Sequence, residues 1–356
     1  MEFLKKRTVH LGAAILLALL SLSVVSLLGA VPRTYAADED LITWCNGLSS
    51  GVSVSGSTCI VTGSVTMSTD VTISSGENLT IGSSGTLTIN SGVTLTVNAG
   101  GIIKIENSAY YGIDNYEGTI TNSGSITIEN TGGNGIYNYC GTITNSGSIT
   151  IENTNVGDGI WNEYGSLSNS GTITIETGGF WGILNDGSLS NSGTIIIENP
   201  GYQSGGIGNA DTGTFTNSGT IIIENSGVLD GMISVGISNS GTMTNSGSIT
   251  IENSAGYGIE NYYGTITNSG SITIGNTAGS DYGIWNYDST ITDTCTGTIA
   301  VTGSGTYAGF TLPVPVTGTC GSTVPQFPVS VLGPLLITAL LFPALVVMRR
   351  RLRTPA

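Results

Sequence analysis

One phrase of about 24 residues recurs along most of the chain. It reads Gly-Ile-x-Asn, then Gly-Thr-Ile-Thr-Asn-Ser-Gly, then Ser-Ile-Thr-Ile-Glu-Asn, with small variations. Seven intervals between successive Gly-Ile-x-Asn words cover 171 residues, and these words begin at Gly112, Gly135, Gly159, Gly182, Gly206, Gly236, Gly258 and Gly283. A fixed period of this length is typical of a solenoid, in which each repeat forms one coil.

The spacing within the repeat predicts three short strands per coil. Upstream of Gly112, aliphatic residues recur at intervals of eight, and three such intervals make 24; they are Ile73, Ile81, Ile89, Val97 and Ile105. In Ser125–Glu129 the alternation sends Ile126 and Ile128 toward a core and the Ser, Thr and Glu side chains toward water. Chain direction is preserved from coil to coil, so equivalent strands pair in parallel. We therefore predict an all-β, right-handed parallel β-helix, because the period is near 24 and no six-residue register is present.

The Asn-Ser-Gly words are expected to form the corners of the coil. Asn and Gly tolerate positive φ, and stacked Asn side chains can hydrogen bond the backbone of the next coil. The whole wording, from Gly-Ile-x-Asn through Gly-Thr-Ile-Thr-Asn-Ser-Gly-Ser-Ile, resembles the passenger domains of bacterial autotransporters and related right-handed β-helix surface proteins. This resemblance covers roughly residues 60–300.

The two ends of the chain predict export and anchoring. Residues 1–36 carry basic residues, a long apolar run and Thr34-Tyr35-Ala36, as in a secretory signal peptide. Residues 329–348 contain no charge and are long enough for a transmembrane helix, and the basic tail at 349–356 is expected in the cytoplasm.

Between these ends the sequence divides into three parts, all expected outside the cell. They are an N-terminal cap with the first coils (37–105), the repeat β-helix (106–300), and a C-terminal cap with a Pro/Thr/Gly-rich stalk (301–328).

The C-terminal segment resembles the PEF-CTERM sorting signal of archaeal surface proteins. Val324-Pro325-Gln326-Phe327-Pro328 is followed by the apolar span and then by Arg349-Arg350-Arg351, with Gln326 where that family usually has Glu. The resemblance implies that an archaeosortase-like membrane peptidase removes the helix and transfers the body to another anchor. Retention of the body by the helix itself is the alternative.

The predicted exported body is strongly acidic. Residues 37–348 contain 23 Asp and Glu and one basic residue, Lys104, which gives a net charge of −22, and the one His of the chain is His10. Nucleic acid and anionic membrane surfaces are excluded as electrostatic partners. Ser-His-Asp and Cys-His catalysis are also excluded from the body.

Two series of outward residues are candidates for function. Aromatic side chains recur in and beside the Gly-Ile-x-Asn words, and exposed aromatics beside carboxylates commonly bind sugar rings; the ligand-binding candidates are Tyr137, Tyr139, Trp161, Tyr164, Trp285 and Tyr287. Packing of these rings over the corners of neighbouring coils is the alternative. A ladder of Glu residues supplies weak metal candidates for loosely bound Ca²⁺, or else forms a hydrated ridge; these are Glu129, Glu152, Glu176 and Glu198. No other cofactor is predicted.

Four cysteines near the two ends of the predicted solenoid are disulfide candidates. Cys45 and Cys59 bracket the first coil region, and Cys295 and Cys320 bracket the last, although four cysteines allow three pairings. Cys140 is left over. Asn78-Leu79-Thr80 is a glycosylation sequon, which makes Asn78 a candidate modification site.

We therefore expect a non-enzymatic, membrane-anchored surface protein. Its expected roles are adhesion, glycan contact or envelope structure, with glycans, cell-surface polymers or neighbouring copies as partners. One alternative is a polysaccharide-acting β-helix enzyme, which would need an isolated pair of carboxylates. The other is a self-assembling surface-layer component.

Overall fold

The computed structural model describes residues 39–310, apart from 83, 153, 177–178, 199–204, 225–234, 253–255, 276–281, 295–296 and 303–305. The predicted signal peptide, most of the stalk, the apolar span and the basic tail lie outside the described residues. Within the part of the chain that is described, no helix is both long and apolar enough to cross a bilayer.

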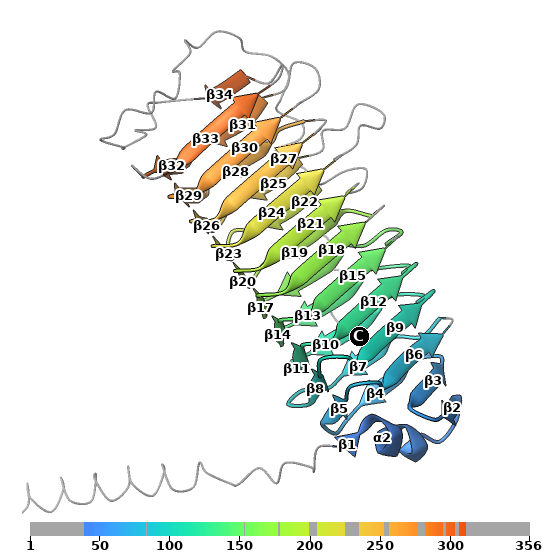
Figure 1. Ribbon diagram of the computed structural model, residues 1–356. Helices are drawn as coiled ribbons and strands as arrows, with labels where there is room; N and C mark the ends of the chain where they lie inside the picture. The colour runs from blue at the N-terminus through green and yellow to red at the C-terminus, as the bar shows by residue number, and fades with distance from the viewer. Residues whose placement is uncertain are drawn as a thin grey trace, which may run out of the picture.

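The described chain is an all-β, right-handed parallel solenoid with three strands per coil, as the repeat predicts (Figure 1). Within each coil the chain passes through sheet C, then sheet A, then sheet B, and equivalent strands of successive coils pair in parallel. The exception is the antiparallel pair of β2 and β3 at the N-terminal end. Eleven strands at about 4.8 Å spacing make the stack roughly 50 Å long.

The strands of each sheet occupy equivalent positions in successive coils. Sheet A consists of β1 (Glu39–Asp40), β5 (Val71–Ile73), β8 (Thr94–Val97), β11 (Thr119–Asn122), β14 (Thr142–Asn145), β17 (Ser166–Asn169), β20 (Ser188–Asn191), β23 (Thr214–Asn217), β26 (Thr242–Asn245), β29 (Thr265–Asn268) and β32 (Thr290–Asp293). Sheet B consists of β2 (Val52–Ser55), β3 (Thr58–Thr62), β6 (Asn78–Gly82), β9 (Ile102–Glu106), β12 (Ser125–Glu129), β15 (Ser148–Glu152), β18 (Thr172–Glu176), β21 (Thr194–Glu198), β24 (Thr220–Glu224), β27 (Ser248–Glu252), β30 (Ser271–Gly275) and β33 (Thr298–Thr302). Sheet C consists of β4 (Val65–Met67), β7 (Leu87–Ile89), β10 (Ile113–Tyr116), β13 (Ile136–Tyr139), β16 (Ile160–Glu163), β19 (Trp181–Asn185), β22 (Gly205–Asn209), β25 (Val235–Asn239), β28 (Ile259–Tyr262), β31 (Tyr282–Tyr287) and β34 (Thr306–Phe310).

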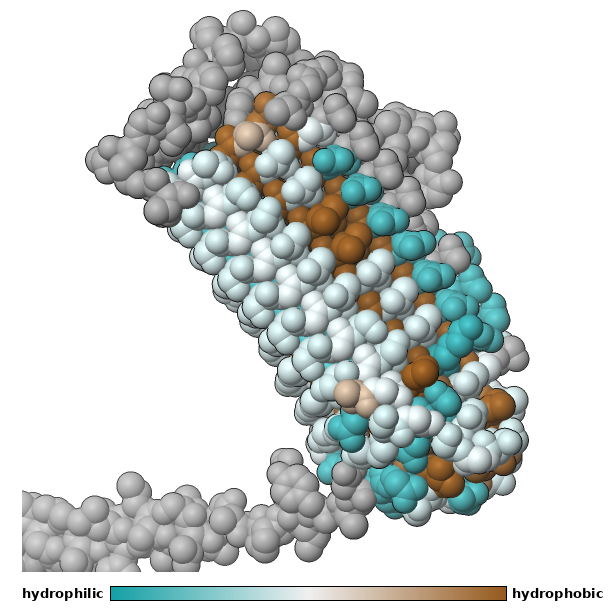
Figure 2. All heavy atoms as spheres, in the orientation of Figure 1, coloured by the Kyte–Doolittle hydropathy of each residue, from teal (hydrophilic) through white to brown (hydrophobic). Residues whose placement is uncertain are grey.

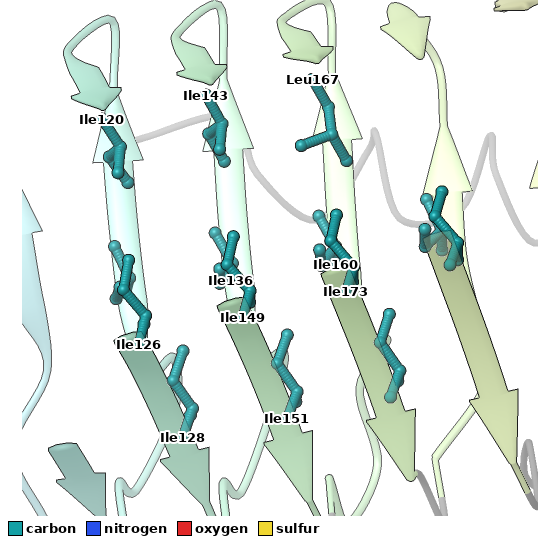
Figure 3. Packing of buried hydrophobic residues seen from close by; sticks show 14 of the residues in the cluster. Ile120, Ile126, Ile128, Ile136, Ile143, Ile149, Ile151, Ile160, Leu167 and Ile173 are labelled. Carbon is teal, nitrogen blue, oxygen red and sulfur yellow. The ribbon is translucent and has the colours of Figure 1, made fainter. Parts of the chain in front are cut away.

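The core is a set of aliphatic ladders that run along the solenoid. Ile126 and Ile128 are fully buried, as predicted, and in Figure 3 they lie in line with Ile149 and Ile151 of the next coil. Ser125, Thr127 and Glu129 alternate with them on the outer side. Figure 2 shows the resulting outer surface, which is largely pale, with hydrophilic residues along one edge and some hydrophobic residues in the middle.

Two ladders of buried Asn side chains run beside the aliphatic ladders. The first, at the ends of the sheet A strands, contains the Asn of seven Asn-Ser-Gly words: Asn122, Asn145, Asn169, Asn191, Asn217, Asn245 and Asn268. The second contains the Asn of each Gly-Ile-x-Asn word: Asn115, Asn138, Asn162, Asn185, Asn209, Asn239, Asn261 and Asn286. In both ladders the side-chain Nδ2 of every member except Asn286 donates to Oδ1 of the next coil, for example Asn145 to Asn169 at 2.7 Å. These bonds satisfy polar groups that would otherwise be costly to bury.

The geometry of the Asn-Ser-Gly corners differs from the prediction. In the words from Asn122 to Asn268 no glycine has a positive φ, whereas Gly92 of the earlier Asn90-Ser91-Gly92 has a φ of 76°. A Cβ on Gly147 would lie only 2.2 Å from the carbonyl oxygen of Gly124, so glycine is required there by the close approach of the preceding coil. Positive φ occurs instead just after sheet C strands, at Glu117, Cys140 and Tyr164, among others.

The N-terminal end of the stack is covered by the short helix α2 (Leu41–Gly47). Asp40 caps this helix by accepting a hydrogen bond from the Thr43 backbone N–H at 2.8 Å. Leu41 and Trp44 are buried against the first coils, and a disulfide joins Cys45 to Cys59 on β3. The helix thereby covers a strand edge that would otherwise be open to pairing with another chain.

Candidate functional site

The outer face of sheet C carries a different residue at each coil. The position between the inward Ile and the inward Asn of each Gly-Ile-x-Asn word lies on this face, and the parallel register aligns these positions in one column, which we call the sheet C column. Its members are Asp114, Tyr137, Trp161, Leu184, Gly208, Ser238, Glu260 and Trp285. Aromatic residues at its two ends form two separate clusters.

The first aromatic cluster consists of Tyr111, Tyr116, Tyr137, Tyr139, Trp161 and Tyr164. The Tyr137 ring lies 5.0 Å from Tyr111 and 5.1 Å from Trp161, measured between ring centroids. Because rings of neighbouring coils cover one another, Tyr137 is only 7% exposed and Trp161 8%. The prediction that these two side chains face solvent is therefore wrong, and packing between coils describes them better.

The polar atoms of these two buried side chains also have partners on the next coil. The Tyr137 hydroxyl donates to Glu163 at 2.5 Å, and the Trp161 indole Nε1 donates to Asp186 at 3.4 Å. Both side chains are thus packed and hydrogen-bonded within the protein. Exposed rings in this cluster are found at its margin, where Tyr116 stacks on Tyr139 at 5.3 Å and Tyr164 lies edge-on to Tyr139 at 6.4 Å.

The residues in the middle of the sheet C column have small side chains or none. Gly208 and Ser238 occupy adjacent coils. A Cβ on Gly208 would lie 3.0 Å from ring atoms of Trp181, so the indole of Trp181 covers this position. This packing interrupts the aromatic series that the sequence suggested.

The second aromatic cluster consists of Tyr257, Tyr262, Tyr263, Trp285 and Tyr287. The Trp285 ring is nearly parallel to Tyr257 at 5.5 Å and to Tyr262 at 6.0 Å, and Tyr262 stacks on Tyr287 at 5.1 Å. Unlike Trp161, Trp285 is only partly buried. The candidates Trp285 and Tyr287 therefore lie together, about five coils from the first cluster.

Trp285 also differs from Trp161 in its polar contacts. No described residue accepts a hydrogen bond from the Trp285 indole nitrogen, whereas Trp161 donates to Asp186. On the following strand, β34, the residue paired with Trp285 is Ala308, so the aromatic series of the column ends at Trp285. The indole of Trp285 thus combines partial exposure with a donor that has no described partner.

Glu260 is the carboxylate of this region. It pairs in register with Ser238 on one side and Trp285 on the other, and it accepts a hydrogen bond from the Ser238 hydroxyl at 3.2 Å. Burial raises the pKa of Glu260, and the Ser238 hydrogen bond opposes this only in part. Glu260 was not among the candidate residues singled out from the sequence; its position between Tyr257 and Tyr262 was the available signal that it would be partly buried.

The Glu ladder lies at the ends of the sheet B strands. Glu129, Glu152, Glu176 and Glu198 pair in register from coil to coil. At its N-terminal end Lys104 bridges two coils, with Nζ 2.6 Å from Glu106 and 3.3 Å from Glu129. Among the described residues, no three His, Cys, Asp or Glu side chains gather closely enough to hold a metal ion.

The remaining predicted sites do not belong to either aromatic cluster. Asn78 is half-buried at the start of β6, with its Nδ2 3.5 Å from the Thr58 hydroxyl. Cys295 and Cys320 fall outside the described residues. Cys140 is exposed beside the first aromatic cluster, and local desolvation together with the negative charges of Glu117 and Glu163 raises the pKa of its thiol.

Comparison of the chain with protein-family models, curated proteins and solved structures finds no match.

Proposed function

We propose that this protein is a non-enzymatic cell-surface β-helix whose solenoid contacts glycans. The leader-like segment 1–36 directs the chain out of the cell. The apolar segment 329–348 then holds the chain at the membrane, either permanently or until it is removed as a PEF-CTERM signal. The rigid stack of coils then acts as a scaffold, and its function resides on surface columns.

The second aromatic cluster is the observation that carries this proposal. It brings Trp285, Tyr257 and Tyr262 together around the half-buried carboxylate of Glu260. Aromatic rings supply apolar contact area to the C–H faces of sugars, while a carboxylate and an indole N–H supply directed hydrogen bonds. The first cluster lacks this combination, because the polar atoms of Tyr137 and Trp161 are already bonded within the protein.

The composition of the body supports binding over catalysis. Between residues 37 and 348 there is no His or Arg, and the single Lys104 is engaged by Glu106 and Glu129. A glycosidase would instead rely on two carboxylates placed about 5–10 Å apart across a bound sugar.

A glycan array probed with the full-length chain tests the proposal. Binding should be saturable, and Trp285→Ala should weaken it at least tenfold. Tyr164→Ala, which removes an exposed ring from the first cluster, serves as the matched control and should leave binding within twofold. Equal losses in the two variants would contradict the assignment to the second cluster, and the absence of binding by the unaltered chain would refute glycan contact altogether.

The anchoring part of the proposal has a separate test. If the C-terminal segment is processed as the resemblance to PEF-CTERM implies, mass spectrometry of the protein from its own cells should find the body without residues 329–356. If the apolar segment is retained, the intact C-terminus should be recovered in the membrane fraction. Recovery of an intact chain in the soluble fraction would contradict both forms of anchoring.

A further inference from the structure

Glu260 has an unusual position among the carboxylates of the solenoid. The Glu residues of the sheet B ladder stand at strand ends on the outer edge, whereas Glu260 lies within the sheet C column. Tyr257 and Tyr262 precede and follow it along the same coil, and both of their rings pack against Trp285 of the next coil. The carboxylate is therefore flanked by aromatic rings on a rigid sheet.

The protein supplies Glu260 with a hydrogen bond and no described counter-charge. Its partner is the neutral hydroxyl of Ser238. The one basic residue between 37 and 348, Lys104, already bridges Glu106 and Glu129 near the other end of the solenoid. A partly buried carboxylate is costly to keep ionised without a cation beside it. A cationic group on a bound ligand would remove that cost.

We propose that Glu260, with Ser238, Trp285 and Tyr262, forms a binding site for a glycan residue that carries a free, protonated amino group. The ammonium pairs with the Glu260 carboxylate, and the indole nitrogen of Trp285 donates to a ring or hydroxyl oxygen. The exposed part of the Tyr262 side chain contacts the C–H face of the sugar. This inference rests on the proposed glycan-contact function and names its ligand class.

An amino sugar fits these surroundings better than a lysine side chain of a partner protein. Lysine presents an ammonium on a flexible stem and makes use of one carboxylate. Here the Trp285 indole, with its N–H donor, is paired in register with Glu260 and packs against the Tyr262 ring, which favours a ligand ring with several polar substituents and an apolar face. The charge of the ligand also complements the net −22 of the body.

The test compares two oligosaccharides of the same length, glucosamine tetramer and N-acetylglucosamine tetramer, by calorimetry on the full-length chain. We expect the free-amine form to bind at least tenfold more tightly, because acetylation removes the positive charge. Glu260→Gln should abolish this preference. Glu252→Gln, which removes one charge from the sheet B ladder of the preceding strand, is the matched control and should change affinity less than twofold.

The outcomes separate this inference from the function on which it rests. Equal losses in Glu260→Gln and Glu252→Gln would show diffuse attraction to an acidic surface and would overturn the site. Tighter binding of a lysine tetramer, with the same dependence on Glu260, would overturn the amino-sugar assignment in favour of a protein partner.

Binding of the acetylated tetramer or of neutral glycans, unaffected by Glu260→Gln, would overturn the inference while supporting glycan contact. The absence of binding to any glycan would overturn both. Thermal melting of Glu260→Gln shows whether the variant is folded. Trp285→Phe keeps an aromatic ring and removes the indole donor, and it should lower the affinity for the glucosamine tetramer independently of the Glu260 charge.

Discussion

The Asn ladder at the ends of the sheet A strands permits a quantitative prediction for Asn169→Ala. The side chain of Asn169 is 1% exposed, and its Nδ2 donates to Asn191 Oδ1 at 2.8 Å and to the Thr194 carbonyl oxygen at 3.0 Å. Its Oδ1 accepts from Asn145 Nδ2 at 2.7 Å. Truncation removes these three bonds and a longer one from Nδ2 to the Gly171 carbonyl oxygen at 3.3 Å.

The two neighbouring amides are affected unequally. Asn145 Nδ2 keeps the carbonyl oxygens of Thr172 and Gly147 as acceptors, at 3.1 and 3.3 Å. Asn191 Oδ1 loses its donor while remaining buried. An orphaned buried acceptor costs about 1–3 kcal/mol, and the lost bonds add about 1 kcal/mol, so we expect a loss of about 2–4 kcal/mol in the free energy of unfolding.

Urea unfolding followed by circular dichroism measures this loss. Ser168→Ala, at the exposed neighbouring position on β17, is the control and should stay within about 0.5 kcal/mol of the unaltered chain. The reasoning is refuted if Asn169→Ala and Ser168→Ala have the same stability. That result would mean that the amide ladder contributes no more than the close packing of the backbone around it.

Three further predictions concern the same solenoid. Asn169→Asp should be more destabilising than the Ala variant at pH 7, because an ionised carboxylate cannot donate to Asn191, and stability should return as acid protonates it; unfolding curves between pH 7 and 4 decide this. Ile128→Asp should disrupt its coil by placing a charge at a fully buried position, and a melting temperature unchanged from that of the unaltered chain would contradict the inward ladder. Burial raises the pKa of Glu260 in the folded state, so ionisation of Glu260 destabilises the fold at high pH, and this penalty disappears as the pH falls through the folded-state pKa. Glu260→Gln should thus stabilise the protein at pH 7 and lose this advantage toward pH 4.5. A stability difference that does not change with pH would be inconsistent with the burial of Glu260.

The repeat allowed most of the fold to be predicted because it constrains every coil in the same way. The inward position of Ile126 and Ile128 follows directly from alternation. The second Asn ladder could have been found by the same rule, since Asn138 stands two residues after Ile136 and therefore on the same inner side. It was missed because a buried amide needs a hydrogen-bond partner and none is evident nearby in the sequence. The partner is the equivalent Asn about 24 positions away, as in the pair of Asn138 and Asn162.

The exposure of the aromatic residues could not be predicted in this way. Alternation placed Tyr137 and Trp161 outside the core correctly, yet their burial depends on rings contributed by neighbouring coils and by Tyr111. The side of a strand on which a residue lies is a local property, whereas coverage of that side depends on what the adjacent coil provides. The contrast between Trp161, bonded to Asp186, and Trp285 has the same origin.

The outer faces of the three sheets differ in how constant their residues are from coil to coil. On sheets A and B the outward positions repeat Thr, Ser and Glu over many coils, with Ile196 and Ile222 as exceptions on sheet B, which satisfies the β-propensity of a strand. In the sheet C column the residue changes at every coil, from Leu184 through Gly208, Ser238 and Glu260 to Trp285. The inner Ile and Asn ladders of sheet C stay constant at these coils, so the inner side of this sheet is already specified without the column. A half-buried carboxylate among aromatic rings is thus a departure that stability does not require, and ligand binding is the reason we propose for it.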